Sequence, residues 1–239
     1  MRSSRLSALR RDTSGVALLE FAMSFPVLLA VGMYGIDVAN LALTNLRLNQ
    51  IALNLADNAS RVGVNSTLSK QQMREVDVND IFEGAKAQGA SVNLATNGRV
   101  ILSSLERDSN GVQRIHWQRC LGSKSGATYE SHYGQAQNAD GSTDASTDTT
   151  KLGPTAPNGM GDVGTKVNAP TNGSGVMFVE INYRYTPMFS WLSAPSDLRF
   201  VASFIVRDPR DFNRIFNPSP AVASNKINYC GYPSRVSPT

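Results

Sequence analysis

The chain has 239 residues, of which 41% are hydrophobic, and a formal net charge of +4. This length is enough for one domain of ordinary size together with a membrane anchor. The first fifteen residues hold four arginines and one aspartate, whereas the rest of the chain is almost neutral, with 19 Lys and Arg against 18 Asp and Glu. A nucleic-acid-binding protein needs a basic face that neutralises phosphates, so this charge distribution argues against a nucleic-acid partner.

A basic leader and a long apolar segment open the chain. The leader, residues 1–15, is followed by an apolar run over residues 16–36 that contains one charge, Glu20. At 1.5 Å per residue, a helix of this length reaches the ~30 Å thickness of a bilayer core. Because basic residues favour the cytoplasmic side, we expect the N-terminus in the cytoplasm and the remainder outside the cytoplasmic membrane. The alternative is a signal anchor that is never cleaved.

Glu20 is unusual for its surroundings. An ionised carboxylate within a membrane helix costs about 2.5–3.5 kcal/mol on insertion scales, so it points to a function with a partner group. Cleavage after Gly15 would create an α-amino group at Val16, four residues from Glu20 and on the same helix face. We expect this amine to pair with Glu20 of the same chain or of a neighbouring chain and so to set a docking register. The alternative is that Glu20 reaches the nearby membrane surface.

The residues that follow the leader resemble the processing site of type IV prepilins. The stretch GVALLEFA begins at Gly15; Pro26 then lies in a leucine-rich run, and Gly35-Ile36-Asp37 closes it. This combination is similar to the TadE-like pseudopilins of tight-adherence (Tad, or Flp) pilus systems. The likeness is close over residues 10–62. It is weaker over residues 176–207, which resemble the C-terminal hairpin of that family.

The resemblance implies a processed protein of pilus assembly. A prepilin peptidase would cleave between Gly15 and Val16, Glu20 would have the assembly role of the fifth mature residue, and Phe21 would fill the aromatic place after it. The protein would then be a minor pilin or pseudopilin of the bacterial inner membrane, or of a surface pilus. Its partners would be the peptidase, other pilins, the assembly machinery and membrane lipid. Larger TadG-like relatives share a similar anchor, and an uncleaved, anchored binding or adhesion protein of that type is the alternative function.

One long helix is predicted from Val16 to Arg61. Pro26 removes a backbone donor and crowds the carbonyl four residues earlier, so we expect a kink, which neighbouring groups make tolerable in a membrane helix. Over residues 37–62 the apolar residues recur at spacings of three, four and seven, which is typical of an amphipathic helix. They are Leu41, Leu48, Ile51, Leu55, Ala59 and Val62.

An outer domain is predicted over residues 63–207. It has a second helix at about 78–88 and four strands, at 99–106, 112–120, 176–185 and 199–207. Asn110-Gly111 is a turn signal between the first two strands, because Gly readily adopts a positive φ. The fold class is therefore α+β, with a pilin-like helical spine and a small antiparallel sheet.

Two segments of this region are expected to be irregular. Residues 122–174 are poor in large apolar side chains, so we expect most of this segment to be a flexible loop that buries too little surface to offset its ordering entropy. The proline-rich tail, residues 208–239, is likewise expected to be irregular.

The two cysteines, Cys120 and Cys230, form a candidate disulfide, because disulfides persist outside the cytoplasm of a bacterium. The alternative is two unpaired buried thiols. Structural zinc needs four ligands, so a pair of cysteines does not predict a zinc site. The histidines, His116 and His132, lie in a strand and in the predicted loop, and no nucleophile elbow or phosphate-binding loop is present. We therefore predict no catalytic, metal or cofactor site, no enzyme activity and no small-molecule substrate.

Overall fold

A computed structural model describes residues 15–63, 70–108, 110–136, 153–171 and 173–231. Within these ranges the chain combines a long N-terminal helix with a small antiparallel sheet, and the predicted α+β class is confirmed. The chain divides into two compact units. The first holds the helix as far as Leu43 together with residues 186–195, and the second holds residues 44–185 and 196–239.

Helix α2 (Val16–Arg61) is one continuous helix of 46 residues that passes through Pro26. The first part of α2 carries apolar side chains on all sides, so it has no separate polar face. Its last part is amphipathic, and the buried residues repeat at helical spacing in the second unit: Leu48, Ile51, Ala52, Leu55, Ala56 and Ala59. The predicted periodic stripe is thus buried at four of its six positions. Leu41 is half-buried, and Val62 lies after the helix has ended.

Four antiparallel strands form the main sheet in the order β3-β2-β4-β5. They are β2 (Gly98–Arg107), β3 (Gln113–Leu121), β4 (Val176–Tyr185) and β5 (Ser196–Ile205). The predicted strands all exist, and their ends agree to within three residues. Gly111 adopts a φ of 77° in the turn between β2 and β3, and Asp108 accepts backbone hydrogen bonds there from Asn110 and Val112 at 2.9 Å.

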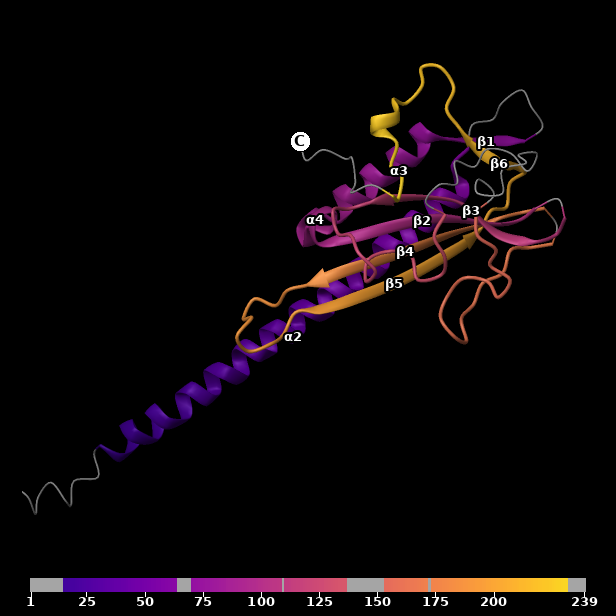
Figure 1. Ribbon diagram of the computed structural model, residues 1–239. Coiled ribbons are helices and arrows are strands. Elements are labelled where there is room, and N and C mark those ends of the chain that lie inside the picture. Colours follow the sequence, from indigo (N-terminus) through magenta and orange to yellow (C-terminus); the bar gives the residue numbers. More distant parts are fainter. Residues whose placement is uncertain (1–14, 64–69, 109, 137–152, 172, 232–239) are drawn as a thin grey trace, which may run out of the picture. The chain divides into compact units, whose positions relative to one another are not determined.

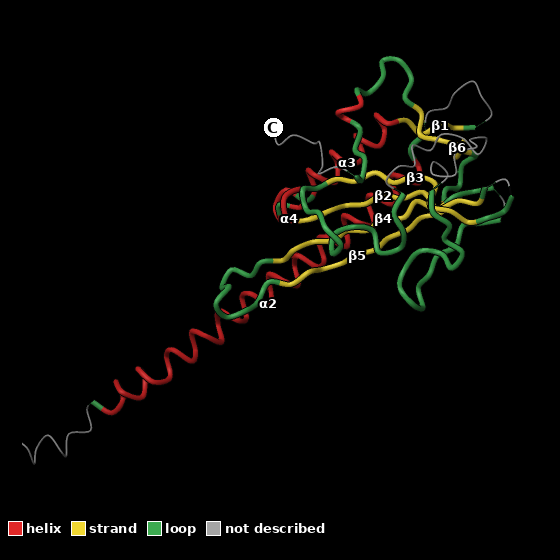
Figure 2. The backbone as a smooth tube through the Cα atoms, viewed as in Figure 1, coloured by secondary structure: helices red, strands yellow, loops and turns green. Residues whose placement is uncertain are grey.

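Strands β2, β3 and β4 are buried on both faces of the sheet, whereas in the edge strand β5 only Ala202 is buried. Paired residues share a face, so Leu102 opposite Val179 and Val100 opposite Ile181 define one of them. In Figures 1 and 2 the amphipathic part of α2 passes behind the strands of this unit, and its apolar side chains, such as Leu48 and Leu55, are buried. Helix α3 (Glu75–Gln88) is tied to the sheet by Glu75, which accepts hydrogen bonds from the fully buried Arg119 of β3 at 2.5 and 3.1 Å.

The opposite face of the sheet is covered by parts of the segment that was expected to be a flexible loop. One buried cluster combines strand residues with residues of this segment: Leu105, Ile115, Val176 and Phe178 with Ala136, Ala156, Met160 and Ala169. Most described residues of this segment, 122–136 and 153–171, are exposed or half-buried and belong to no helix or strand, in line with the predicted loop, whereas these few side chains are buried. Three alanines and one methionine are enough to cover this face of the sheet, because the strands supply the large apolar side chains against which they pack. Residues 137–152 lie outside the described residues.

The tail also differs from the expectation of an irregular segment. Strand β6 (Arg210–Phe216) pairs in parallel with β1 (Gln71–Arg74), and a short 3-10 helix (Ser224–Lys226) follows. Two further short pieces, a 3-10 turn (Ala90–Val92) and α4 (Leu94–Asn97), connect α3 to β2.

Arg210 joins the tail to the end of the long helix. Its guanidinium donates to the carbonyls of Ala59 at 3.0 Å, Ser60 at 3.1 Å and Val62. The last carbonyls of a helix have no partner within the helix, so a cation is favourable at this place. Burial lowers the pKa of Arg210 to about 10, and the group is still charged at neutral pH.

Candidate functional site

The first turn of α2 presents the predicted processing and assembly residues to solvent. Gly15 precedes the helix, and its carbonyl accepts a hydrogen bond from the amide of Leu19 at 3.2 Å. Val16, Glu20 and Phe21 are all exposed. Val16 and Glu20 are four residues apart in a regular helix and therefore share a face.

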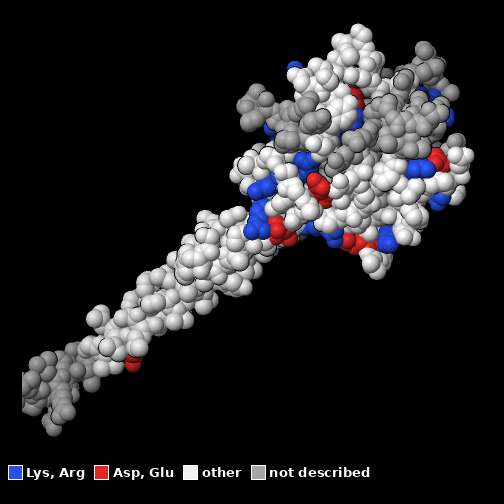
Figure 3. Space-filling model, in the orientation of Figure 1, with Lys and Arg blue, Asp and Glu red and all other residues white. Residues whose placement is uncertain are grey.

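The apolar part of α2 is long enough to cross a membrane. None of its most apolar stretch is buried by other parts of the described chain. The sequence between Gly15 and Asp37 contains one charged residue, Glu20. In Figure 3 this part of the helix is uncharged along its length, apart from an acidic group near its N-terminal end. A helix that exposes apolar side chains on all sides is suited to lipid or to a bundle of similar helices. This finding is consistent with a single-pass anchor.

Aromatic and hydroxyl groups surround the proline in this helix. The rings of Phe21 and Phe25 stack with their centroids 5.2 Å apart. The hydroxyl of Ser24 donates to the carbonyl of Phe21 at 3.3 Å. The carbonyl that loses its helix donor at Pro26 is that of Ala22, four residues earlier, so the Ser24 hydroxyl bonds a neighbouring carbonyl and does not replace the missing donor. Helix α2 continues through Pro26, and the expected kink stays a prediction.

Asp37 holds the loop that connects β4 to β5. Its carboxylate accepts a hydrogen bond from the amide of Met188 at 2.9 Å and from the amide of Phe189 at 3.4 Å. Only 3% of Asp37 is exposed. The loop then turns back on itself, with the amide of Leu192 donating to the carbonyl of Phe189 at 2.8 Å. Hydrogen bonds to an ionised acceptor are stronger than neutral ones, so this contact fixes the loop against the helix.

The same loop exposes two large apolar side chains. Met188 is 68% exposed and Trp191 is 71% exposed. The ten residues from Thr186 to Pro195 contain no charged side chain. The loop and the apolar part of α2 belong to one compact unit, which therefore carries most of the exposed apolar surface of the described chain.

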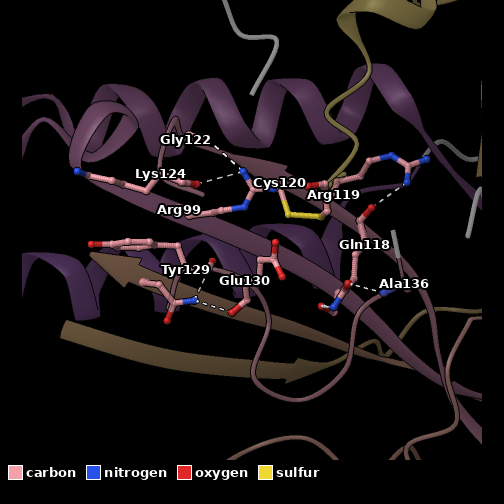
Figure 4. Close-up of a disulfide and its surroundings, with 12 residues drawn as sticks. Arg99, Gln118, Arg119, Cys120, Gly122, Lys124, Tyr129, Glu130 and Ala136 are labelled. Atoms are coloured by element: carbon pink, nitrogen blue, oxygen red, sulfur yellow. Dashed lines mark hydrogen bonds between the residues drawn. A yellow bond between two sulfur atoms is a disulfide. The ribbon is translucent and has the colours of Figure 1, made fainter. Parts of the chain in front are cut away.

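The predicted disulfide is present in the second unit. Cys120 of β3 and Cys230 of the tail are bonded at 2.08 Å with their Cα atoms 4.8 Å apart (Figure 4). Arg99 lies beside them and donates to the carbonyls of Cys230 and of Lys124, the latter at 3.3 Å. Burial lowers the pKa of Arg99, and the acidic Glu130 opposes that shift. The disulfide joins the tail to β3, and Arg99 beside it joins the tail to the start of the 122–174 segment.

Gln118 fastens the next part of that segment. Its side-chain amide donates to the hydroxyl of Ser103 and to the carbonyl of Gly134, both at 2.9 Å. Its carbonyl oxygen accepts from the amide of Ala136 at 2.8 Å (Figure 4). This interaction holds residues 134–136 against the sheet.

Histidine, acidic and amide side chains meet on this face of the sheet. The Nδ1 atom of His132 lies 2.7 Å from the carboxylate of Glu180, whose side chain is 1% exposed. The side-chain amide of Asn182 donates a hydrogen bond to the same carboxylate. The backbone amide of His132 donates to the same carboxylate at 3.1 Å. These bonds position residues 129–132 on β4. In the described part of the chain, no three His, Cys, Asp or Glu side chains gather in a way that could hold a metal ion.

The structure brings some predicted residues together and separates others. Gly15 immediately precedes α2, Val16, Glu20, Phe21 and Pro26 lie along its first three turns, and the two cysteines lie in the other unit. Sequence reasoning assigned Asp37 only to the end of the apolar helix and missed the loop that it binds. The available signal was PMFSW, an uncharged run of apolar residues in an expected turn.

Comparison of the chain with known protein families, with curated proteins and with solved structures found no match.

Proposed function

We propose that the chain is a membrane-anchored minor pilin or pseudopilin of TadE-like type, processed by a prepilin peptidase after Gly15 and active in assembly of an adhesive Flp/Tad pilus. One observation carries the proposal. The exposed apolar helix begins immediately after Gly15, and its one charge, Glu20, stands at the fifth position of the chain that cleavage would leave.

The energetics of the helix support an assembly role. A helix with apolar side chains on all sides is stable in lipid, and it must be taken up by other helices when it leaves the bilayer. A buried carboxylate then needs a partner. An amine at Val16 of a neighbouring chain supplies one, and pairing between the two charges would set the axial register of the helices.

The experiment that tests the proposal is the intact mass and N-terminal sequence of the protein from membranes with and without the peptidase. We expect a chain that starts at Val16 only when the peptidase is present. A chain that starts at Met1 in both membranes contradicts the proposal and favours the uncleaved TadG-like anchor.

Glycine variants make this test specific. A Cβ atom at Gly15 would meet no atom within 4 Å, and the same is true at Gly32 and Gly35. Bulk at position 15 is therefore compatible with the fold, and Gly15→Val should abolish cleavage through lost recognition by the peptidase. Gly32→Ala is the matched control and should be cleaved normally. Equal cleavage of both variants would contradict processing at Gly15.

A further inference from the structure

The loop Thr186–Pro195 exposes apolar side chains at a defined place along α2. Met188 and Trp191 are each more than two-thirds exposed, at 68% and 71%. A loop that faces water normally exposes polar side chains, and contiguous exposed apolar residues indicate an interaction surface. This loop has no charge along its ten residues.

The hydrogen bonds to Asp37 give the loop a depth. Residues 16–36 form 21 residues of continuous helix in which Glu20 is the one charged residue, and Asp37 is the next residue. With a rise of 1.5 Å per residue, this run spans ~30 Å, so Asp37 lies where the hydrocarbon core of a bilayer ends. The amides of Met188 and Phe189 are held on its carboxylate and therefore lie at the same level.

The residue types of the loop suit that level. Tryptophan has a large apolar ring with one N–H donor and is enriched at the boundary between hydrocarbon and headgroups. Tyr34 is 55% exposed on α2, less than one turn before Asp37, and adds a second aromatic side chain of this kind. The charges that flank the loop in sequence, Arg184 and Asp197, pair with each other at 2.8 Å. An uncharged loop between two paired charges lowers the cost of contact with lipid.

We propose that the loop Thr186–Pro195 is a second membrane contact, in which Met188 and Trp191 insert into the headgroup boundary of the bilayer that α2 crosses. The occupant of this surface is lipid. The inference rests on the anchor of the proposed function and not on its processing. The contact would fix the rotation of α2 about its own axis, because only one side of the helix carries the loop.

The two tryptophans of the chain make the proposal measurable. Trp191 is exposed, whereas Trp117 of β3 is 2% exposed. We would reconstitute the full chain in phosphatidylcholine and phosphatidylglycerol vesicles whose acyl chains carry bromine either near the headgroup or near the chain end. The difference in fluorescence between the wild-type chain and Trp191→Phe reports on Trp191 without any change to the core. Flotation after an alkaline carbonate wash tests the anchor separately.

We expect shallow bromine to quench Trp191 several-fold more strongly than deep bromine, and Trp117, observed in Trp191→Phe, to be unaffected by either. Asp37→Ala should weaken the shallow quenching, because the loop is released. If the vesicles retain the chain, but Trp191 fluorescence is quenched by aqueous iodide and not by brominated lipid, this inference alone is overturned. Loss of the chain from the vesicles overturns the anchor. A blue shift of Trp191 that appears only with added pilin, without quenching by bromine, assigns the surface to a protein partner and also overturns the inference.

Discussion

At the residue scale, two carboxylates in α2 have opposite surroundings. Glu20 is exposed in a stretch of apolar residues, and Asp37 is almost fully buried by the loop that it binds. A carboxylate that accepts backbone amides has its charge stabilised within the chain, whereas an exposed one in lipid needs a partner from elsewhere. The two residues therefore serve different purposes although both interrupt the apolar helix. Asp37 orders the loop of this chain, and in the proposed function Glu20 would contact another chain.

Replacement of Glu20 by Gln should separate processing from assembly. The variant keeps the shape of the side chain and loses its charge, so we expect normal cleavage after Gly15. Association with partner pilins should fall by about tenfold or more. A charge in lipid costs a few kcal/mol, and pairing with a partner recovers part of this cost, so the neutral variant gains less from association. Co-purification from membranes measures this. Ser24→Ala, one turn further along the helix, is the neutral control, and equal co-purification of both variants would show that Glu20 sets no register.

Replacement of Asp37 by Ala should release the β4–β5 loop. Hydrogen bonds to a charged acceptor contribute about 1.5–3 kcal/mol each, so protection of the amides of Met188 and Phe189 from hydrogen exchange should fall by about tenfold or more. Asp37→Asn retains an acceptor oxygen and should lose less protection. If Asp37→Ala leaves both amides as protected as before, another contact holds the loop.

At the scale of elements, the C-terminal end of α2 depends on a residue from the tail. Arg210 supplies donors to three carbonyls at the end of this helix, and it belongs to a strand that pairs with β1. Helix ends that are buried without such donors leave unsatisfied acceptors. The spine of the molecule and its tail are therefore stabilised together.

Replacement of Arg210 by Ala should lower the free energy of unfolding by about 2–4 kcal/mol, because it leaves buried carbonyls without donors. Urea denaturation measures this loss, and hydrogen exchange should accelerate in the last turn of α2. The control is Arg61→Ala at the same helix end. The side chain of Arg61 is 74% exposed and pairs with Asp57, and an exposed pair contributes about 0–1 kcal/mol. Equal effects of the two variants would mean that Arg210 is no cap.

Sequence patterns predicted some elements well and others not at all. The long helix and the four main strands were accessible because each has a strong local period of hydrophobicity. Strand β1 has four residues and pairs with β6 from the far end of the chain, so no local pattern marks either of them. The packing of residues 153–171 was missed for a related reason, since Ala156 and Met160 are buried by a surface that the strands supply.

The candidate site shows the same division. Gly15 and Glu20 were found because they are only five residues apart in the sequence. The cysteine pair was found because the chain has only two cysteines. The pairing of Asp37 with Met188 joins residues 151 positions apart. Such a contact joins segments that are far apart in the sequence, so no local pattern of residues predicts it.

At the scale of the whole molecule, the disulfide closes most of the outer domain. It joins residues 110 positions apart, and in the chain-entropy model a loop of that length is worth about 4–5 kcal/mol. The double variant Cys120→Ala/Cys230→Ala should lose about this much free energy of unfolding, as measured by urea denaturation. The wild-type chain in reducing agent should match it. A loss below about 1 kcal/mol would show that the tail is held by its other contacts, such as Tyr229, whose ring lies 4.6 Å from the guanidinium of Arg119.

The joining of the tail to early parts of the chain has a consequence for the timing of folding. Arg210 and Cys230 leave the ribosome long after α2, β1 and β3, to which they are bound in the finished molecule. Contacts of such long sequence separation form late, because loop-closure entropy opposes them until the whole chain is available. A nascent chain that has not yet reached Arg210 therefore has an uncapped helix end and an unpaired β1, and one that has not yet reached Cys230 has a free thiol at Cys120. The outer domain is therefore closed only after the segment that carries Arg210 and Cys230 has been made.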